Sequence, residues 1–183
     1  MACSRTAILG FSFLLVTTAA PAAADSDSAS DAQLAADVED AIGRFQEKDR
    51  TFKPTLEKLV GYAIFPEVAK GGFIVGGAGG RGEVYAGGTL IGHAQLSQGT
   101  IGAQIGGQKF AEIIFFRTKS ALNRFKKNRL ELSAQATATA ADQGGAAAAK
   151  YADGIAIFIL PTAGLMAEAS IGGQKLKFAP LKE

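Results

Sequence analysis

The fold of this chain is decided by the stretch GYAIFPEVAKGGFIVGGAGGRGEVY, residues 61–85. Short runs of Ile, Val, Phe and Tyr alternate in it with single and paired glycines. β-Branched and aromatic residues favour strands, and glycines within such runs are typical of tight turns, bulges and close backbone approach. The stretch therefore predicts glycine-rich β-structure.

The same texture continues downstream, and residues 61–107 hold 15 of the 23 glycines in the chain. No long helical pattern separates the apolar runs, so antiparallel meanders fit better than a parallel βαβ arrangement. We predict strands at residues 73–75, 83–85, 89–91, 110–116, 130–138, 155–160 and 165–178. The tract around Gly144 and Gly145 is compatible with a loop or a weak helix.

Two segments of this β-rich region are similar to each other in sequence. At a constant offset of 93, seven of 21 positions agree between residues 61–81 and 154–174, and IGGQK occurs at both 105–109 and 171–175. We hypothesise two equivalent strand–turn–strand units around one core. Closure or strong curvature would also remove exposed strand edges. The predicted fold is α+β, with a curved antiparallel sheet or small β-barrel flanked by helices.

Helices are predicted on either side of the glycine-rich region. Apolar residues recur at helical spacing over residues 31–47, with Ser30 or Asp31 near the N-cap, and this stripe is expected to pack on the core. A short helical turn is expected at residues 54–60. Thr118 can cap a further helix that runs to about Asn128, with an inward face formed by Ala121, Leu122 and Phe125.

The N-terminal residues have the pattern of an export signal. Arg5 precedes an apolar run over residues 7–20, which ends in alanines and is shorter than a bilayer span. We predict a signal peptide at residues 1–24, a flexible leader at 25–32 and a single domain at 33–183. The expected location is the periplasm or the exterior of a bacterial cell; the alternative is an uncleaved membrane anchor.

The charge balance conceals two opposed blocks. The whole chain carries a net charge of +2, but residues 25–50 sum to −5 and residues 51–183 to +6. A near-neutral total argues against a general nucleic-acid binder, and export would remove the protein from most nucleic acid.

Catalytic and metal-binding constellations are not evident in the sequence. His93 is the one histidine, nothing pairs it with a nucleophile, and it is interpreted as an ordinary strand residue. No His, Asp and Glu cluster has metal-ligand spacing. The motif G-x-G-x-x-G at residues 77–82 precedes a strand instead of a helix, so it is interpreted as a hairpin turn and not as a dinucleotide site. We therefore expect a protein without enzymatic activity or cofactor.

One run of charge remains unexplained by the fold. Residues 117–129 contain no acid and six bases, namely Arg117, Lys119, Arg124, Lys126, Lys127 and Arg129. Each base near an anionic leaflet contributes on the order of 1 kcal/mol, so a helix that carries them suits a membrane surface. The alternative is a solvated basic helix that pairs with the acidic 25–50 block.

Three blocks of sequence, in the same order, resemble the SYLF domain family. The first is residues 61–85, quoted above; the others are TIGAQIGGQKFAEIIFF, 100–116, and GLMAEASIGGQKLKF, 164–178. The resemblance covers roughly residues 35–180. Eukaryotic members of that family bind phosphoinositide membranes and some bind actin filaments, whereas bacterial members are mostly exported. The resemblance implies a compact lipid-binding module without catalysis.

The resemblance also directs the choice of lipid-binding residues. In eukaryotic relatives lipid binding is associated with a basic N-terminal helix, but the matching helix here is acid-rich. The predicted contact therefore shifts to Phe125 and the six bases of residues 117–129, with Lys70 and Arg81 as secondary candidates. The expected partner is an anionic phospholipid surface, and actin is not expected for an exported protein. The alternatives are a carrier of a small apolar ligand and an envelope protein-interaction or stress module.

Overall fold

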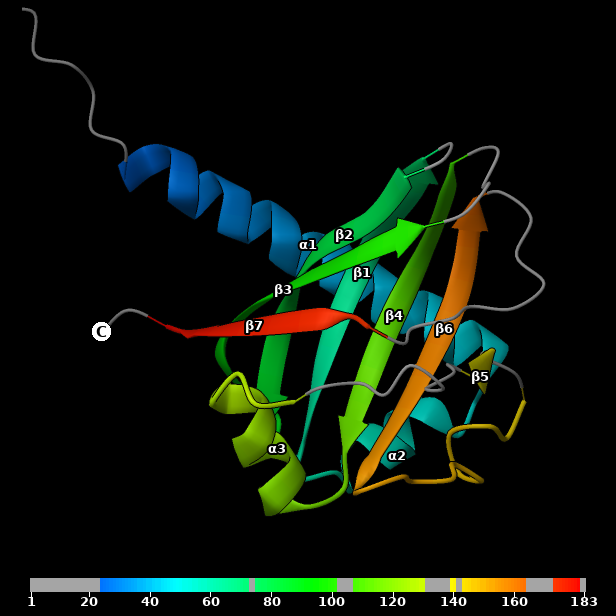
Figure 1. Cartoon of the computed structure of the whole chain (residues 1–183). Helices are drawn as coiled ribbons and strands as arrows, with labels where there is room; N and C mark the ends of the chain where they lie inside the picture. The colour runs from blue at the N-terminus through cyan, green and yellow to red at the C-terminus, as the bar shows by residue number, and fades with distance from the viewer. Residues whose placement is uncertain are drawn as a thin grey trace, which may run out of the picture.

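The computed structural model describes residues 24–72, 75–101, 107–130, 139–140, 143–163 and 173–181 (Figure 1). Its centre is one sheet in the order β5-β6-β4-β1-β2-β3-β7. The strands are β1 (Gly61–Gly72), β2 (Val75–Ala86), β3 (Thr89–Ile101), β4 (Gln108–Phe116), β5 (Thr139–Ala140), β6 (Ile155–Ala163) and β7 (Lys175–Pro180). Six strands pair antiparallel, and the two-residue β5 pairs parallel with β6. The predicted α+β class is confirmed.

The sheet is strongly curved but open. Figure 1 shows β7 crossing in front of β1 and β4, so that the sheet curls over a concave face. Side chains from both ends of the sheet, such as Ile157 on β6 and Phe178 on β7, meet in one core on that face. Within the described residues β6 and β7 do not pair with each other. The curved sheet is therefore confirmed, and the alternative of a small closed barrel is wrong.

Glycines on the concave face allow this curvature. A Cβ at Gly82 would meet the Ile64 carbonyl oxygen and the Phe65 ring, and a Cβ at Gly80 would lie 2.6 Å from the Glu67 carbonyl oxygen. These contacts arise where the β1–β2 register is irregular, between Ile64 and Ala69. The hairpin turn predicted at residues 77–82 is therefore wrong, because these glycines lie inside β2 and admit a neighbouring strand.

The turn between β2 and β3 lies a few residues later. Gly87 and Gly88 both have positive φ, of 56° and 80°. Two consecutive residues of positive φ form a hairpin turn that matches the twist of the flanking strands, and glycine adopts this conformation without a steric penalty. The strands predicted at 83–85, 89–91, 110–116 and 155–160 lie in β2, β3, β4 and β6 and are confirmed.

Helices α1 (Ala24–Lys48) and α2 (Phe52–Leu56) cover the convex face. The apolar stripe of α1, which includes Leu34, Val38 and Phe45, is buried against a second core formed with Phe115 and Phe158 of the sheet. The predicted amphipathic helix is thus confirmed, but it begins earlier than expected. The predicted leader at residues 25–32 is helical, so neither Ser30 nor Asp31 is an N-cap.

A buried carboxylate joins α1 to the segment that precedes β6. Asp49 accepts hydrogen bonds from the Thr51 backbone N–H and hydroxyl at 2.8 and 2.7 Å, from the Gly144 N–H at 3.0 Å and from the Ala146 N–H at 2.7 Å. Burial raises the pKa of this carboxyl, but the four hydrogen bonds outweigh it and hold the pKa below the usual value. The tract around Gly144 and Gly145, for which the sequence allowed a loop or a weak helix, forms turns around the Asp49 carboxylate.

The hypothesis of two equivalent strand–turn–strand units is wrong for their strands. β1 and β6 both flank β4, and Ile64 and Phe158 are both partners of Ile113. The sequence similarity at an offset of 93 instead aligns Ile64 with Ile157, which is one residue before Phe158. A one-residue shift reverses the face of every side chain, so Ile64 lies in the convex core whereas Ile157 lies in the concave core. The later part of the second segment, 164–172, lies outside the described residues.

Three predicted strands fall partly or wholly outside the described residues. They are the strands at 73–75, of which Val75 begins β2, at 130–138, and at 165–178, of which the last residues form β7. β7 returns to β3 and lies at the opposite end of the sheet from β6.

Candidate functional site

The basic run is organised by α3 (Lys119–Lys126), which closes one end of the concave core. Thr118 is the N-cap, as predicted, and its hydroxyl accepts from the Ala121 N–H at 3.2 Å. Ala121, Leu122 and Phe125 are buried. Basic residues in the last turn interact favourably with the negative end of the helix dipole. The helix therefore fixes one apolar face inward and leaves the other for charge.

Most of the bases stand at the surface of this end of the molecule. We call the six bases of residues 117–129 the basic end. Lys119, Lys126, Lys127, Arg129 and Arg117 are exposed, and Arg124 is half-buried. The Arg124 guanidinium donates to the Asp153 carbonyl oxygen at 2.8 Å, and the Arg117 guanidinium lies 5.2 Å from the centre of the Tyr151 ring. Arg117 and Arg124 are thus held in place, and the other four bases are exposed.

None of these six bases forms an ion pair with a carboxylate in the described part of the chain. The alternative that they pair with the acidic block is not supported, because α1 lies on the opposite, convex face of the sheet (Figure 1). The acids of α1 have other partners: Asp31 contacts Arg81, and Asp40 contacts Arg44 at 2.9 Å. Among the described residues, the basic end is therefore a patch of positive charge without a carboxylate partner.

Phe125 does not share this surface. Its side chain is only 1% exposed, and its ring packs 5.0 Å from Phe116 and 6.1 Å from Phe178 between ring centres. The predicted role of Phe125 in lipid contact is corrected accordingly, since the residue belongs to the concave core. Its helical spacing with Leu122 already placed it inward.

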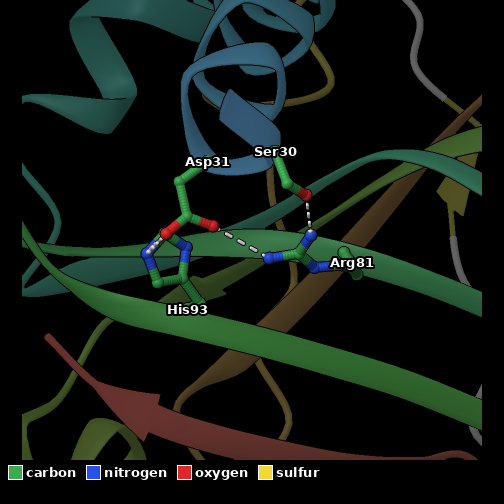
Figure 2. A network of polar contacts seen from close by, with 4 residues as sticks. All are labelled: Ser30, Asp31, Arg81 and His93. Atoms are coloured by element: carbon green, nitrogen blue, oxygen red, sulfur yellow. Dashed lines mark hydrogen bonds and ion pairs between the residues drawn. The ribbon is translucent and has the colours of Figure 1, made fainter. Parts of the chain in front are cut away.

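The two secondary candidates lie elsewhere. Lys70 pairs with Gln108 near the far end of β1, whereas α3 follows Phe116, the partner of Gly61 at the near end. At about 3.3 Å per residue, the nine residues from 61 to 70 place Lys70 about 30 Å away. Arg81 is in the middle of β2 and contacts α1 on the convex face, as Figure 2 shows. The structure does not bring Lys70 or Arg81 together with the basic end.

A buried carboxyl group lies in the concave core. Glu112 is fully buried on β4, and the Gln174 side-chain amide donates to its Oε2 at 3.0 Å. Burial raises the pKa of Glu112 to about 7, with this hydrogen bond acting in the opposite direction. Glu112 Oε1 and Gln174 Oε1 are both buried without a partner among the described residues. A protonated Glu112 can donate to Gln174 and so satisfy both atoms. Nothing in the sequence indicated this partner, which lies 62 positions away.

The described residues show no cluster of three or more His, Cys, Asp or Glu side chains suited to a metal ion. Among them, no helix combines the length and apolar character required to cross a bilayer.

The fold and the basic end together define an open, curved α+β domain that presents a helical patch of positive charge. Residues 97–179, from β3 to β7, match the family described as Ysc84: Las17-binding protein actin regulator. Over these residues the match confirms the predicted resemblance to the SYLF family. Comparison with curated proteins finds no match.

Proposed function

We propose that this protein is a non-enzymatic lipid-binding protein of the bacterial cell envelope, which binds anionic phospholipid membranes peripherally through the basic end. The observation that carries the proposal is the absence of any carboxylate partner for these six bases among the described residues. Membership of a family known for lipid binding and actin-associated roles supports it. The export signal predicted at residues 1–24 supports the location and argues against actin as the partner.

The burial pattern further specifies the mode of binding. Leu122 and Phe125 are in the core, and the one large hydrophobic side chain that is exposed in the described residues is Leu181, after β7. The basic end therefore has charge but no apolar group to insert. We propose attraction of the bases to the anionic leaflet, in which their aliphatic stems lie along the interface. Such binding weakens as salt shortens the screening length from about 10 Å at 0.1 M.

The test is co-sedimentation of residues 25–183 with vesicles of phosphatidylcholine alone or mixed with phosphatidylglycerol. This chain contains every described residue except Ala24 and lacks the apolar N-terminal run, which would itself bind vesicles. The double variant Lys126→Glu/Lys127→Glu reverses two exposed bases at the basic end. The matched control, Lys70→Glu/Lys109→Glu, makes the same change in charge at the far end of the sheet.

We expect binding to the anionic vesicles only, lost at high salt. The first double variant should bind at least about tenfold more weakly, since each base near the surface contributes about 1 kcal/mol. The control should bind within about twofold of the parent. Equal binding to neutral and anionic vesicles, or equal effects of the two double variants, would exclude the basic end as the membrane contact.

A further inference from the structure

A second cationic site lies on the convex face, beside the N-terminal part of α1. A groove of about 300 Å³ is lined by Arg81, His93, Ala94, Gln95, Lys177 and Ala179. Strand register places Arg81, Gln95 and Lys177 in one row across β2, β3 and β7. His93 and Ala179 are partners in the next row. The β2–β3 hairpin and the distant strand β7 thus bring four hydrogen-bonding side chains to one hollow.

The hollow exists because a small side chain faces His93. Neighbouring strands are about 4.8 Å apart, so Arg81 and Lys177 start about 10 Å apart on either side of Gln95. Long side chains from both sides can converge above the Gln95 amide. Ala179, across from His93, leaves the space between them open.

Two polar groups of the groove have no partner of their own in the part of the chain that the structure describes. The Lys177 ammonium forms no ion pair with a described residue. His93 Nδ1 is buried and has no hydrogen-bond partner among these residues. Glu83, the Cα partner of His93 on β2, does not line the groove; its carboxylate instead accepts from the Tyr85 hydroxyl at 2.6 Å. The groove therefore holds more cationic and donor capacity than the chain satisfies.

An anionic group already occupies part of this capacity. Figure 2 shows Asp31 of α1 reaching between Arg81 and His93. Asp31 Oδ1 is 2.9 Å from Arg81 Nη2, and Asp31 Oδ2 is 3.8 Å from His93 Nε2. Arg81 Nη1 also donates to the Ser30 hydroxyl. A single carboxylate that bridges two lining residues occupies the place that two oxygens of a bound anion would take.

We infer that this groove is a binding site for a phosphate monoester, and that Asp31 is its internal competitor. The two cations Arg81 and Lys177 match the two charges of a monoester once Asp31 is displaced. The guanidinium suits two phosphate oxygens, and the Lys177 ammonium and Gln95 amide supply donors for the third. The site is separate from the basic end, so it extends the proposed function without depending on it.

The central test is a pair of matched variants on α1, studied in residues 25–183. Asp31→Asn removes the competitor, whereas Asp37→Asn makes the same charge change at an exposed residue that bonds only Gln33 in the described chain. Glycerol 3-phosphate is titrated while backbone amide NMR shifts of β2, β3 and β7 are followed. We expect Asp31→Asn to bind about fivefold more tightly than the parent, as for loss of an exposed ion pair, and Asp37→Asn to bind within twofold. A misfolded variant cannot produce such a gain.

Loss-of-binding variants complete the test. Lys177→Gln and Arg81→Gln should each weaken binding about tenfold, as loss of a charge-assisted bond predicts. Ala179→Leu fills the hollow without changing charge and should also abolish binding. Lys126→Glu/Lys127→Glu should leave glycerol 3-phosphate binding unchanged, which separates this site from the membrane proposal.

The source of the phosphate is distinguished by four probes: glycerol 3-phosphate, inorganic phosphate, and vesicles that carry phosphatidic acid or phosphatidylglycerol. Groove-dependent binding of the soluble monoester supports a soluble ligand, and binding of phosphatidic acid alone supports a lipid headgroup. Equal affinities of Asp31→Asn and Asp37→Asn would overturn the inference. So would a failure of both the parent and Asp31→Asn to respond to any of the four probes.

Discussion

The acids on the two faces of the sheet differ in how they are partnered. On the convex face, three acids have partners within the chain: Asp31 contacts Arg81, Asp40 contacts Arg44, and Asp49 accepts from four donors. On the concave side, Glu112 has one donor, and the basic end has no carboxylate partner in the described residues.

The glycines follow the same division. Those that face the concave core, such as Gly80 and Gly82, are in contact with neighbouring backbone, whereas a Cβ at Gly99 on β3 would meet nothing within 4 Å. Since Gly99 shares the side of β3 that carries Gln95 and His93, it faces the convex side. The concave side is thus tightly packed around its glycines, whereas Gly99 on the convex side faces open space. The role of a glycine or a base therefore depends on the face of the sheet that it occupies, and composition alone does not assign it.

The largest expected effect comes from filling a concave glycine. In Gly82→Ala the new Cβ would meet the Ile64 carbonyl oxygen and the Phe65 ring, so the backbone of β1 must move. We expect the free energy of unfolding to fall by at least about 3 kcal/mol, measured by urea denaturation.

The matched change on the convex side is Gly99→Ala, which should alter the free energy of unfolding by less than about 1 kcal/mol because the space is open. Similar losses for both variants would show that glycine flexibility, and not close strand approach, accounts for the glycine-rich sequence.

These glycines also show where sequence reasoning succeeds and where it ends. The strands at 83–85 and 110–116 and the Thr118 cap were predictable because alternation, β-branched residues and a cap act locally. Gly82 was misassigned to a turn because the strand that presses on it, the irregular part of β1, is a tertiary neighbour.

Long-range pairing limits the prediction of the site in the same way. The row of Arg81, Gln95 and Lys177 depends on β7 returning to β3, and the contact of Asp31 with Arg81 spans 50 positions. Neither leaves a local periodic signal. The six bases of the basic end were predictable because they fall within thirteen residues of sequence, on α3 and at its two ends, although the burial of Phe125 removed it from the surface.

The second prediction concerns the satisfied carboxylate of the convex face. Asp49→Asn places an amide N–H₂ against a backbone N–H, either Ala146 or Gly144, in a buried site. We expect the free energy of unfolding at pH 7 to fall by about 2–3 kcal/mol. Because the folded-state pKa is lowered, this contribution is present above the unfolded pKa and is lost as pH falls through the folded value.

Asp40→Asn on the same helix is the control. The Asp40 side chain is 72% exposed and pairs only with Arg44, so its loss should change stability by less than about 1 kcal/mol. If Asp49→Asn were equally mild, the turns at 143–148 would not depend on this carboxylate.

The smallest effect, and the sharpest contrast with Asp49, is expected at Glu112. Its folded-state pKa of about 7 exceeds the ordinary value of 4.5, so the folded protein binds more protons than the unfolded chain between these values. The stabilisation contributed by Glu112 is therefore fully present below the unfolded pKa and is lost as pH rises through 7.

Glu112→Gln cannot ionise, and its amide can still accept from Gln174 while donating to the unpartnered Gln174 Oε1. We expect this variant to match the parent within about 0.5 kcal/mol at pH 5 and to exceed it by about 2 kcal/mol at pH 8.5, by urea denaturation at each pH. Glu67→Gln, at an exposed residue paired with Lys109, should show no such divergence. A constant difference between Glu112→Gln and the parent at both pH values would mean that Glu112 keeps one protonation state throughout. The basic end would then be the one group on the concave side whose charge lacks a partner among the described residues.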